Sequence, residues 1–267
     1  MHVHSTASDD SGEAMENSIA CAIAKGLDTI CFTDHLDIRN GRVPSVPFPE
    51  GYPRWARCID EYATIGNKYA GTIDVLLGAE IAEIPQDPAL ARDYASRNNL
   101  DFILGSIHAL PGEQDFYLFK FETQKDCEAL AIRYLDENIA LAELNIADSI
   151  AHIGYINRYM ANQGFGVDLM QYKSRLEKIF TTQIKNGKAI EINTSGLRQA
   201  AYGQSFPNVE ILALYHKLGG RLITIGSDAH SAADVAGKFD VVADIMKDVG
   251  FTHYTVFKKR TPALVAL

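Results

Sequence analysis

Short apolar runs alternate with longer amphipathic stretches along almost the whole chain. Seven short runs carry the residues typical of β-strands, at 1–4, 29–33, 74–80, 102–107, 149–152, 189–193 and 222–226. The stretches that follow them place apolar residues at three- and four-residue intervals, at 12–25, 52–69, 88–97, 124–143, 168–185, 208–218 and 232–249. That spacing is typical of one buried helix face. The alternation therefore predicts seven βα units.

No Gly/Ser-rich linker divides these units, so the sequence predicts one domain over residues 1–267. A last β-like run at 252–257 precedes a short tail. Repeated βα units favour an α/β fold with a closed, irregular barrel over an open doubly wound sheet. The absence of G-x-G-x-x-G after the first run also argues against a dinucleotide site.

Composition narrows the classes of function. The formal net charge of -9 argues against a nucleic-acid binder, because such affinity rests on clustered Lys and Arg. The four cysteines lack C-x-x-C spacing, and we interpret them as reduced core thiols. We find neither a signal-peptide pattern nor an apolar run near 18 residues. We therefore expect a soluble, cytoplasmic protein without a membrane partner; the pattern predicts no oligomeric state.

Metal-ligand residue types gather where the predicted strands end, which is where a parallel barrel places its chemistry. Six of the eight His stand there together with two carboxylates; the set is His2, His4, His35, Glu80, His108, His152, Asp228 and His230. A structural explanation would need a separate reason for each ring. His216, in a predicted helix, and His253 do not stand at the end of one of these strands with other metal-ligand residue types. We interpret them as surface or structural residues.

Imidazole with carboxylate and no thiolate suits zinc, manganese or iron, and the mixture leaves these three open. The two His of the H-x-H pair share one face of a strand, so both can reach one ion. With Asp10, the nine candidate ligands suffice for three divalent ions if water fills the gaps and a carboxylate, for which Glu80 is the candidate, bridges two of the ions. Three ions leave surplus positive charge, which favours a phosphomonoester substrate, although a two-metal centre would weaken this argument.

The ordered set of H-x-H, T-D-H, a lone Glu, S-x-H, A-H-I and S-D-A-H resembles the polymerase and histidinol phosphatase (PHP) family of metal-dependent phosphoesterases across nearly the whole chain. The resemblance implies a distorted seven-stranded (β/α) barrel with three metal ions. It implies three ligand sets: His2, His4, Glu80 and Asp228; Glu80, His108 and His152; and Asp10, His35 and His230. Asp10 follows from the family pattern H-x-H-T-x-x-S-x-D, with Asp9 as the alternative. Because family members carry residues before the H-x-H strand, we expect the natural start to lie upstream of Met1.

Two further segments are similar to the stand-alone histidinol-phosphate phosphatases: A-H-I-G with N-R-Y at 151–159, and E-I-N-T-S-G-L-R at 191–198. They imply hydrolysis of L-histidinol phosphate, a step of histidine biosynthesis, by a metal-bound hydroxide without a phosphoenzyme. We expect Glu80, Asp228 and His230 to be catalytic, and Arg158 and Arg198 to bind the phosphate. Arg39 and Arg42, in a polar loop, are weaker candidates. The alternatives are a PHP phosphoesterase for nucleotides or short nucleic acids, and a non-catalytic metal-binding PHP module.

Overall fold

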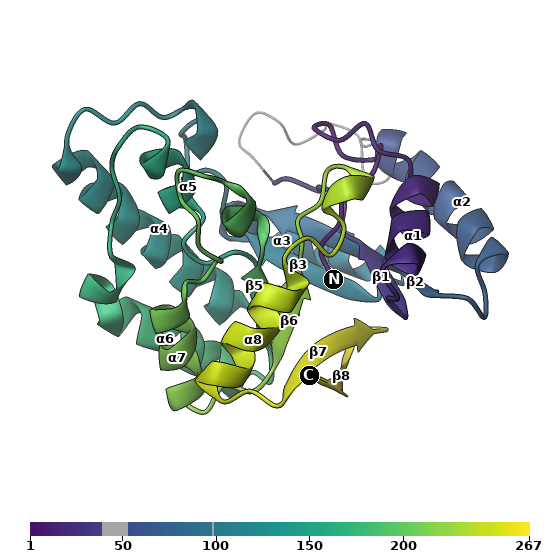
Figure 1. Cartoon of the computed structure of the whole chain (residues 1–267). Helices are drawn as coiled ribbons and strands as arrows, with labels where there is room; N and C mark the ends of the chain where they lie inside the picture. The colour runs from purple at the N-terminus through teal and green to yellow at the C-terminus, as the bar shows by residue number, and fades with distance from the viewer. Residues whose placement is uncertain (39–52, 98) are drawn as a thin grey trace.

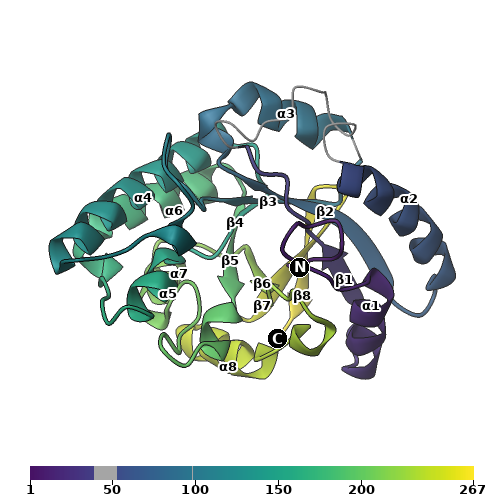
Figure 2. The same cartoon turned by 90° about the horizontal axis from the view of Figure 1, so that it is seen from above.

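The computed structural model describes residues 1–38, 53–97 and 99–267. Within these residues six parallel strands form one curved sheet in sequential order: β1 (Thr29–Phe32), β2 (Asp74–Ala82), β3 (Phe102–Ser106), β4 (Ser149–Ile150), β5 (Ala189–Asn193) and β6 (Ile223–Gly226). Seen from above, the strands follow an arc with the helices on its outer side (Figure 2). The predicted α/β architecture is therefore present, as a sheet curled through part of a barrel.

The helices cover the outer face of this arc (Figure 1). They are α1 (Met15–Ala24), α2 (Pro53–Lys68), α3 (Pro88–Arg97), α4 (Gln124–Leu144), α5 (Ile156–Ala161), α6 (Lys173–Lys185), α7 (Val209–Lys217) and α8 (Phe239–Val249). Short 3₁₀ turns are η1 (Ile84–Gln86), η2 (Phe116–Leu118), η3 (Leu169–Tyr172), η4 (Ser195–Arg198) and η5 (Ala232–Asp234). No helix in the described ranges combines the length and apolar character needed to cross a membrane.

Most helix boundaries follow the predicted ones. The helix at 88–97 has the predicted bounds, and residue 52, the predicted start of α2, lies outside the described residues. The stretches 168–185 and 232–249 each begin with a 3₁₀ turn, η3 and η5, before the helix starts. The short helix α5 was not predicted, because its six residues are too few to display a helical period.

The predicted seventh strand of the barrel, at 1–4, is not confirmed. Among the described residues this segment makes one isolated parallel bridge, between Val3 and Ala229. Its backbone nevertheless has partners on both sides: His4 N donates to Ala229 O, and Thr33 N donates to Val3 O. The segment therefore lies between the residues that follow β6 and those that follow β1, beyond the ends of both strands, where the ladder is too short to form a strand.

An antiparallel hairpin closes the interior of the curved sheet near the amino ends of its strands, opposite to residues 1–4. It consists of β7 (His253–Lys258), which was predicted, and β8 (Thr261–Ala266), which was not. Phe257 of β7 is buried and packs among Cys31, Leu76, Phe102 and Leu104. Figure 1 shows the hairpin below the sheet. The interior of the arc is thus filled by a β7 side chain at this end.

Side chains of the strands alternate between two apolar environments, as expected for a sheet covered on both faces. On β5, Ile190 and Ile192 belong to the large core beneath the helices, whereas Ala189 belongs to the small interior cluster around Phe257. Glu191 and Asn193 share the interior face with Ala189. All four cysteines are free thiols, and three of them are buried, in agreement with their interpretation as reduced core residues.

Candidate metal centre

The nine predicted ligands lie together at the carboxyl ends of the strands. His2 and His4 come from the N-terminal segment and Asp10 from the loop that follows it; the others stand in or just after β1, β2, β3, β4 and β6. Three groups of these side chains have ligand atoms within 4.8 Å of one another: His2, His4 and Glu80; His35, Glu80 and His108; and His4, His35 and His230.

The first predicted ligand set converges on one point. His2 Nε2 lies 3.3 Å from Glu80 Oε2 and 3.7 Å from Asp228 Oδ1. His4 Nε2 lies 3.6 Å and 3.4 Å from the same two oxygens. Both imidazoles are fully buried, so two carboxylates and two ring nitrogens face one another away from solvent.

The second predicted set uses the other oxygen of Glu80. Glu80 Oε1 lies 3.1 Å from His152 Nε2 and 3.3 Å from His108 Nε2. These two ring nitrogens are 3.4 Å apart. Glu80 therefore presents one oxygen to each of the first two ligand sets, which is the geometry expected of a bridging carboxylate.

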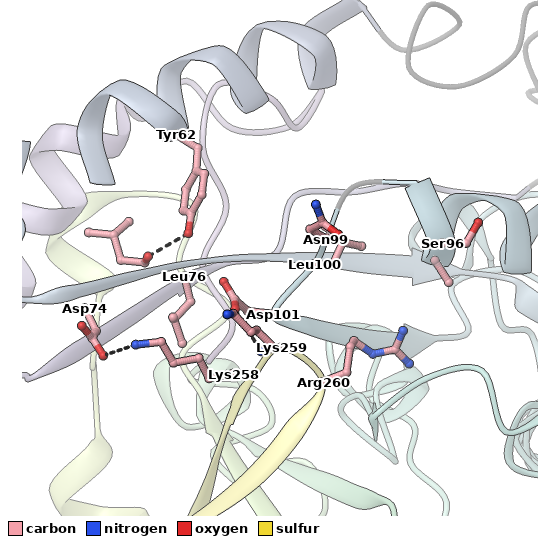
Figure 3. A pocket seen from close by; sticks show the side chains of 12 residues that line it. Tyr62, Asp74, Leu76, Ser96, Asn99, Leu100, Asp101, Lys258, Lys259 and Arg260 are labelled. Carbon is pink, nitrogen blue, oxygen red and sulfur yellow. Dashed lines mark hydrogen bonds and ion pairs between the residues drawn. The ribbon is translucent and has the colours of Figure 1, made fainter. Parts of the chain in front are cut away.

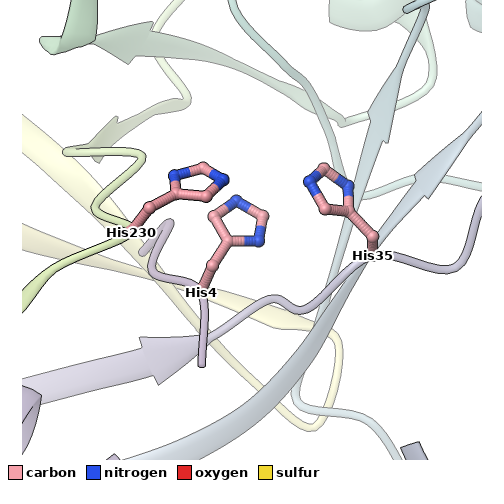
Figure 4. A group of neighbouring side chains, drawn as sticks. All are labelled: His4, His35 and His230. Carbon is pink, nitrogen blue, oxygen red and sulfur yellow. The ribbon is translucent and has the colours of Figure 1, made fainter. Parts of the chain in front are cut away.

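The third predicted set lies nearer to solvent. Asp10 Oδ2 is 3.2 Å from His230 Nε2 and 3.5 Å from His35 Nε2, and the Asp10 side chain is 57% exposed. The rings of His35 and His230 both stack on His4, with centroids 4.4 and 4.2 Å away (Figure 4). His35 Nδ1 also lies 3.1 Å from Glu80 Oε2, so this ring links the third set to the bridging carboxylate.

The charges of the cluster suit a cation. Burial alone would raise the pKa of Glu80 and of Asp228, but the neighbouring imidazoles, His2 first, hold both values well below their usual range. Burial opposes protonation of the imidazoles, yet Glu80 raises the pKa of His35 to about 10 and that of His108 to about 9. Divalent ions can supply the positive charge that protonated rings otherwise provide. The donor set therefore fits a metal centre.

Two of the predicted ligands occupy backbone conformations that non-glycine residues rarely adopt. The φ angle of His152 is 25° and that of Asp228 is 52°. Hydrogen bonds hold both peptides: His152 N donates to Glu191 Oε2, and Asp228 N donates to His2 O. Strained residues of this kind cluster at functional sites, where the surrounding structure stabilises them.

Sequence reasoning missed two buried carboxylates behind the ligands, Asp34 and Glu191. Asp34 accepts hydrogen bonds from Ser5 N at 2.6 Å and from Ser8 Oγ at 2.7 Å. Ser8 Oγ in turn lies 3.1 Å from His4 Nδ1. Asp34 belongs to the T-D-H segment that resembles the PHP family, but its partners come from a loop whose path the sequence does not reveal.

The two predicted phosphate-binding arginines line a cavity of about 250 Å³ beside the ligands, together with Ser195, Gln199, Asp228, His230 and Asp234. Arg158 lies over the rings of Tyr155 and Tyr159, with its guanidinium carbon 5.1 and 5.6 Å from their centroids. Arg198 Nε lies 3.2 Å from Asp234 Oδ1. The cavity thus places two guanidinium groups next to Asp228 and His230.

Other sequence candidates lie elsewhere. His216 packs edge-on against Phe251, and His253 is exposed on β7, in agreement with their exclusion from the site. Arg39 and Arg42 lie outside the described residues. A larger cavity of about 760 Å³ opens at the other end of the sheet, between the start of β2 and the β7–β8 turn (Figure 3). Its described lining includes Tyr62, Asp74, Asp101 and Lys258, and none of the nine predicted ligands.

Comparisons with known proteins identify the family of this chain. A model of the PHP domain family matches residues 1–195. A probable histidinol-phosphatase of Thermotoga maritima is 29% identical over 260 residues, which cover 97% of this chain and 96% of that protein. A histidinol-phosphatase of Lactococcus lactis is 26% identical and covers 96% and 93%. A probable phosphatase of Photobacterium profundum is 25% identical and covers 97% and 89%.

Two solved structures share the fold. The crystal structure of histidinol phosphate phosphatase from Lactococcus lactis, complexed with zinc, L-histidinol and phosphate, has a TM-score of 0.76 at 24% identity and covers 98% of this chain and 97% of that chain. The putative histidinol phosphatase of Listeria monocytogenes also has a TM-score of 0.76, at 17% identity, and covers 90% and 98%. At these identities the likeness establishes the fold.

Proposed function

This chain belongs to the PHP domain family, and from that premise we propose that it is a metal-dependent phosphomonoesterase that hydrolyses L-histidinol phosphate to L-histidinol and phosphate. The observation that carries the proposal is the convergence of nine imidazole and carboxylate ligands beside a cavity lined by Arg158 and Arg198. The substrate is supported by relatives named histidinol-phosphatase that match almost the full length of the chain.

The ligand geometry supports three divalent ions, with zinc, manganese and iron as the candidates. His2, His4, Glu80 and Asp228 would hold the first ion, and Glu80, His108 and His152 the second. Asp10, His35 and His230 would hold the third. The zinc in the Lactococcus lactis complex supports a metal of this class. Such ions, when bound, neutralise phosphate oxygens and lower the pKa of a bound water.

The residues in and around the cavity have different proposed roles in binding the substrate and in catalysis. Arg158 and Arg198 can bind phosphate oxygens in two-point fashion, which fixes the phosphorus relative to the ligands. Glu80 and Asp228 would hold buried negative charge against the ions, and His230, which lines the cavity, would hold the third ion next to the phosphate. These three are our catalytic candidates. This mechanism needs no Ser or Cys nucleophile, so we expect hydrolysis without a phosphoenzyme.

The test is phosphate release from L-histidinol phosphate, nucleoside monophosphates and short oligonucleotides, with elemental analysis of the same preparation. We expect kcat/KM for L-histidinol phosphate to exceed that for the nucleotides by about 100-fold or more, because polar recognition discriminates strongly. Preference for a nucleotide would reject the substrate. Fewer than three bound ions would reject the trinuclear centre, and a phosphoenzyme trapped by rapid quenching would reject direct hydrolysis.

A different phosphoester is the second candidate, because the Photobacterium profundum relative is named only as a probable phosphatase. The net charge of -9 disfavours polyanionic substrates such as oligonucleotides. The same panel separates the two candidates. Failure of the fully metallated protein to hydrolyse any phosphoester would instead indicate a non-catalytic metal-binding module.

A further inference from the structure

Glu191 is a buried carboxylate that belongs to none of the three ligand sets. It lies on the interior face of β5, in the segment E-I-N-T-S-G-L-R, and is 1% exposed. Oε1 lies 2.7 Å from His2 Nδ1. Oε2 accepts hydrogen bonds from His152 N at 2.9 Å and from Asn193 Nδ2 at 3.0 Å. Both oxygens of this side chain therefore contact residues of the metal centre or their immediate support.

The two ligands that Glu191 contacts belong to different sets. His2 belongs to the first set and His152 to the second, on opposite oxygens of Glu80. Glu191 accepts a hydrogen bond from the peptide N–H of His152, and this residue has a strained φ of 25°. A change in the position of Glu191 would therefore affect the first two ligand sets at once.

The contact with His2 also selects a tautomer. A neutral imidazole carries one N–H, and the nitrogen without the proton is the one that binds a metal ion. When Nδ1–H donates to Glu191, the lone pair of Nε2 is left facing Glu80 and Asp228. Metal-binding imidazoles are commonly oriented by a carboxylate in this way.

Gly226 shows that the surrounding structure is fitted to Glu191. A β-carbon at position 226 would overlap Glu191 Oε1 and would lie 2.7 Å from His2 Cβ. The last residue of β6 must therefore be glycine for the Glu191–His2 contact to form. The glycine of the G-S-D-A-H segment is thus explained by the space that Glu191 and His2 need, and not by the predicted ligands that follow it in the segment.

We propose that Glu191 is a positioning residue that sets the tautomer of His2 and holds the peptide of His152, so that a single carboxylate aligns the first two metal sites. The proposal rests on the proposed function, because it supposes that these sites bind metal. It adds a residue that lies outside the three predicted ligand sets and outside the lining of the cavity beside them.

The decisive variant is Glu191→Gln, which keeps the size of the side chain. His2 Nδ1 and His152 N face different oxygens of Glu191, and in glutamine one of these two positions is an NH2 group, which donates and cannot accept. We expect the dissociation constant for the more weakly held metal ions to rise about 10- to 100-fold, as for other partners of metal-binding imidazoles. We measure it by titration against a chelator, and we follow the ring nitrogens of His2 by NMR. The His2 ring should be protonated at Nδ1 in the original protein and should lose this preference in the variant.

Asp101→Asn is a matched control at the opposite end of the sheet. Asp101 is also a buried carboxylate that accepts two backbone N–H groups, from Leu77 at 3.1 Å and from Lys259 at 3.0 Å. Its replacement should lower the Tm and leave metal affinity unchanged. Gly226→Ala is a second variant, which crowds both Glu191 and His2 without removing a polar group and should also weaken metal binding.

Unchanged metal affinity and an unchanged His2 tautomer in Glu191→Gln would overturn the positioning role. An equal loss of metal affinity in Asp101→Asn would also overturn it, because the effect would then be general destabilisation. If the original protein binds metal but hydrolyses no phosphoester, the proposed function fails, while the metal affinities of the variants still decide the role of Glu191.

Discussion

Glu80 contacts imidazoles through both carboxylate oxygens, and the whole candidate centre is arranged around it. His108 and His152 approach one oxygen, whereas His2 and His35 approach the other. A residue with such contacts has to lie on a rigid element, and Glu80 lies within β2, the longest strand of the sheet. At the residue scale, the centre is thus fixed by one strand position to which the other ligands converge.

The first prediction concerns the arginines of the cavity. Arg198→Ala should raise KM for phosphate esters about 10-fold or more, because a hydrogen bond to a charged group contributes about 1.5–3 kcal/mol. Steady-state kinetics measure the change. Arg175→Ala is the control, since Arg175 lies on α6 and pairs with Asp136 at 2.7 Å, away from the cavity. An unchanged KM in Arg198→Ala would reject phosphate binding by Arg198.

The sequence predicted the residues that the structure brings together, because strand ends in a parallel sheet meet at one edge. It did not predict the partners behind them. Ser8 connects His4 to Asp34 only because the loop 5–14 folds over β1, and Glu191 meets His2 only because β5 and the N-terminal segment approach each other. A charged residue in the apolar run A-I-E-I-N was the available signal for Glu191.

At the scale of elements, close packing between neighbouring strands depends on glycine. A β-carbon at Gly78 would lie 2.8 Å from Thr33 Cγ2 and 2.9 Å from Phe102 O. Gly78→Ala should therefore lower the free energy of unfolding by about 1–3 kcal/mol, the usual effect of overpacking. Urea denaturation measures it.

Gly66, in α2, is the matched control for Gly78. Apart from its two chain neighbours and the backbone of its own helix, no atom of the described residues lies within 4 Å of the position that a β-carbon would occupy. Gly66→Ala should raise the free energy of unfolding by about 0.5–1 kcal/mol, because alanine loses less backbone entropy in a helix. If both variants change the free energy of unfolding in the same direction, the packing explanation is contradicted.

The sequence failed to predict strands correctly where the hydrophobic pattern of a segment does not match its hydrogen-bond pairing with other strands. Residues 1–4 have the pattern of a strand, but their partners lie beyond β1 and β6, so only one bridge forms among the described residues. β8 was missed for the opposite reason. Its residues are exposed and include Pro262, so they lack the alternation of a half-buried strand, yet they pair with β7 along six positions.

At the scale of the whole molecule, the two ends of the curved sheet have different roles. Phe257 is 1% exposed, and its ring stacks on Phe102 with centroids 5.3 Å apart. Phe257→Ala should lower the free energy of unfolding by about 3–5 kcal/mol, because it leaves a cavity in the interior cluster. Metal content should stay unchanged, since Phe257 closes the end opposite to the ligands. A variant that unfolds at the same urea concentration as the original protein would contradict this role.

Removal of metal ions tests the end of the sheet that carries the predicted ligands. Ligands that bind only the folded state stabilise it, by about 2.7 kcal/mol at a free concentration 100 times the dissociation constant. Chelation should therefore lower the Tm by about 5 °C or more for a protein of this size, and added metal should restore it. Differential scanning calorimetry measures both steps. A Tm that does not respond to chelation would contradict a metal-stabilised centre.

The N-terminal segment lies between the residues that follow β1 and those that follow β6, and this determines when the centre can form. Met1 N donates to Ile225 O, a contact between residues 224 positions apart. A ribosome makes His2 and His4 before any of the strands of the sheet, but Asp228 and His230 only after all the helices up to α7. The predicted ligands of the first and third sets can therefore come together only after most of the chain has been made, because each set includes a residue that follows β6.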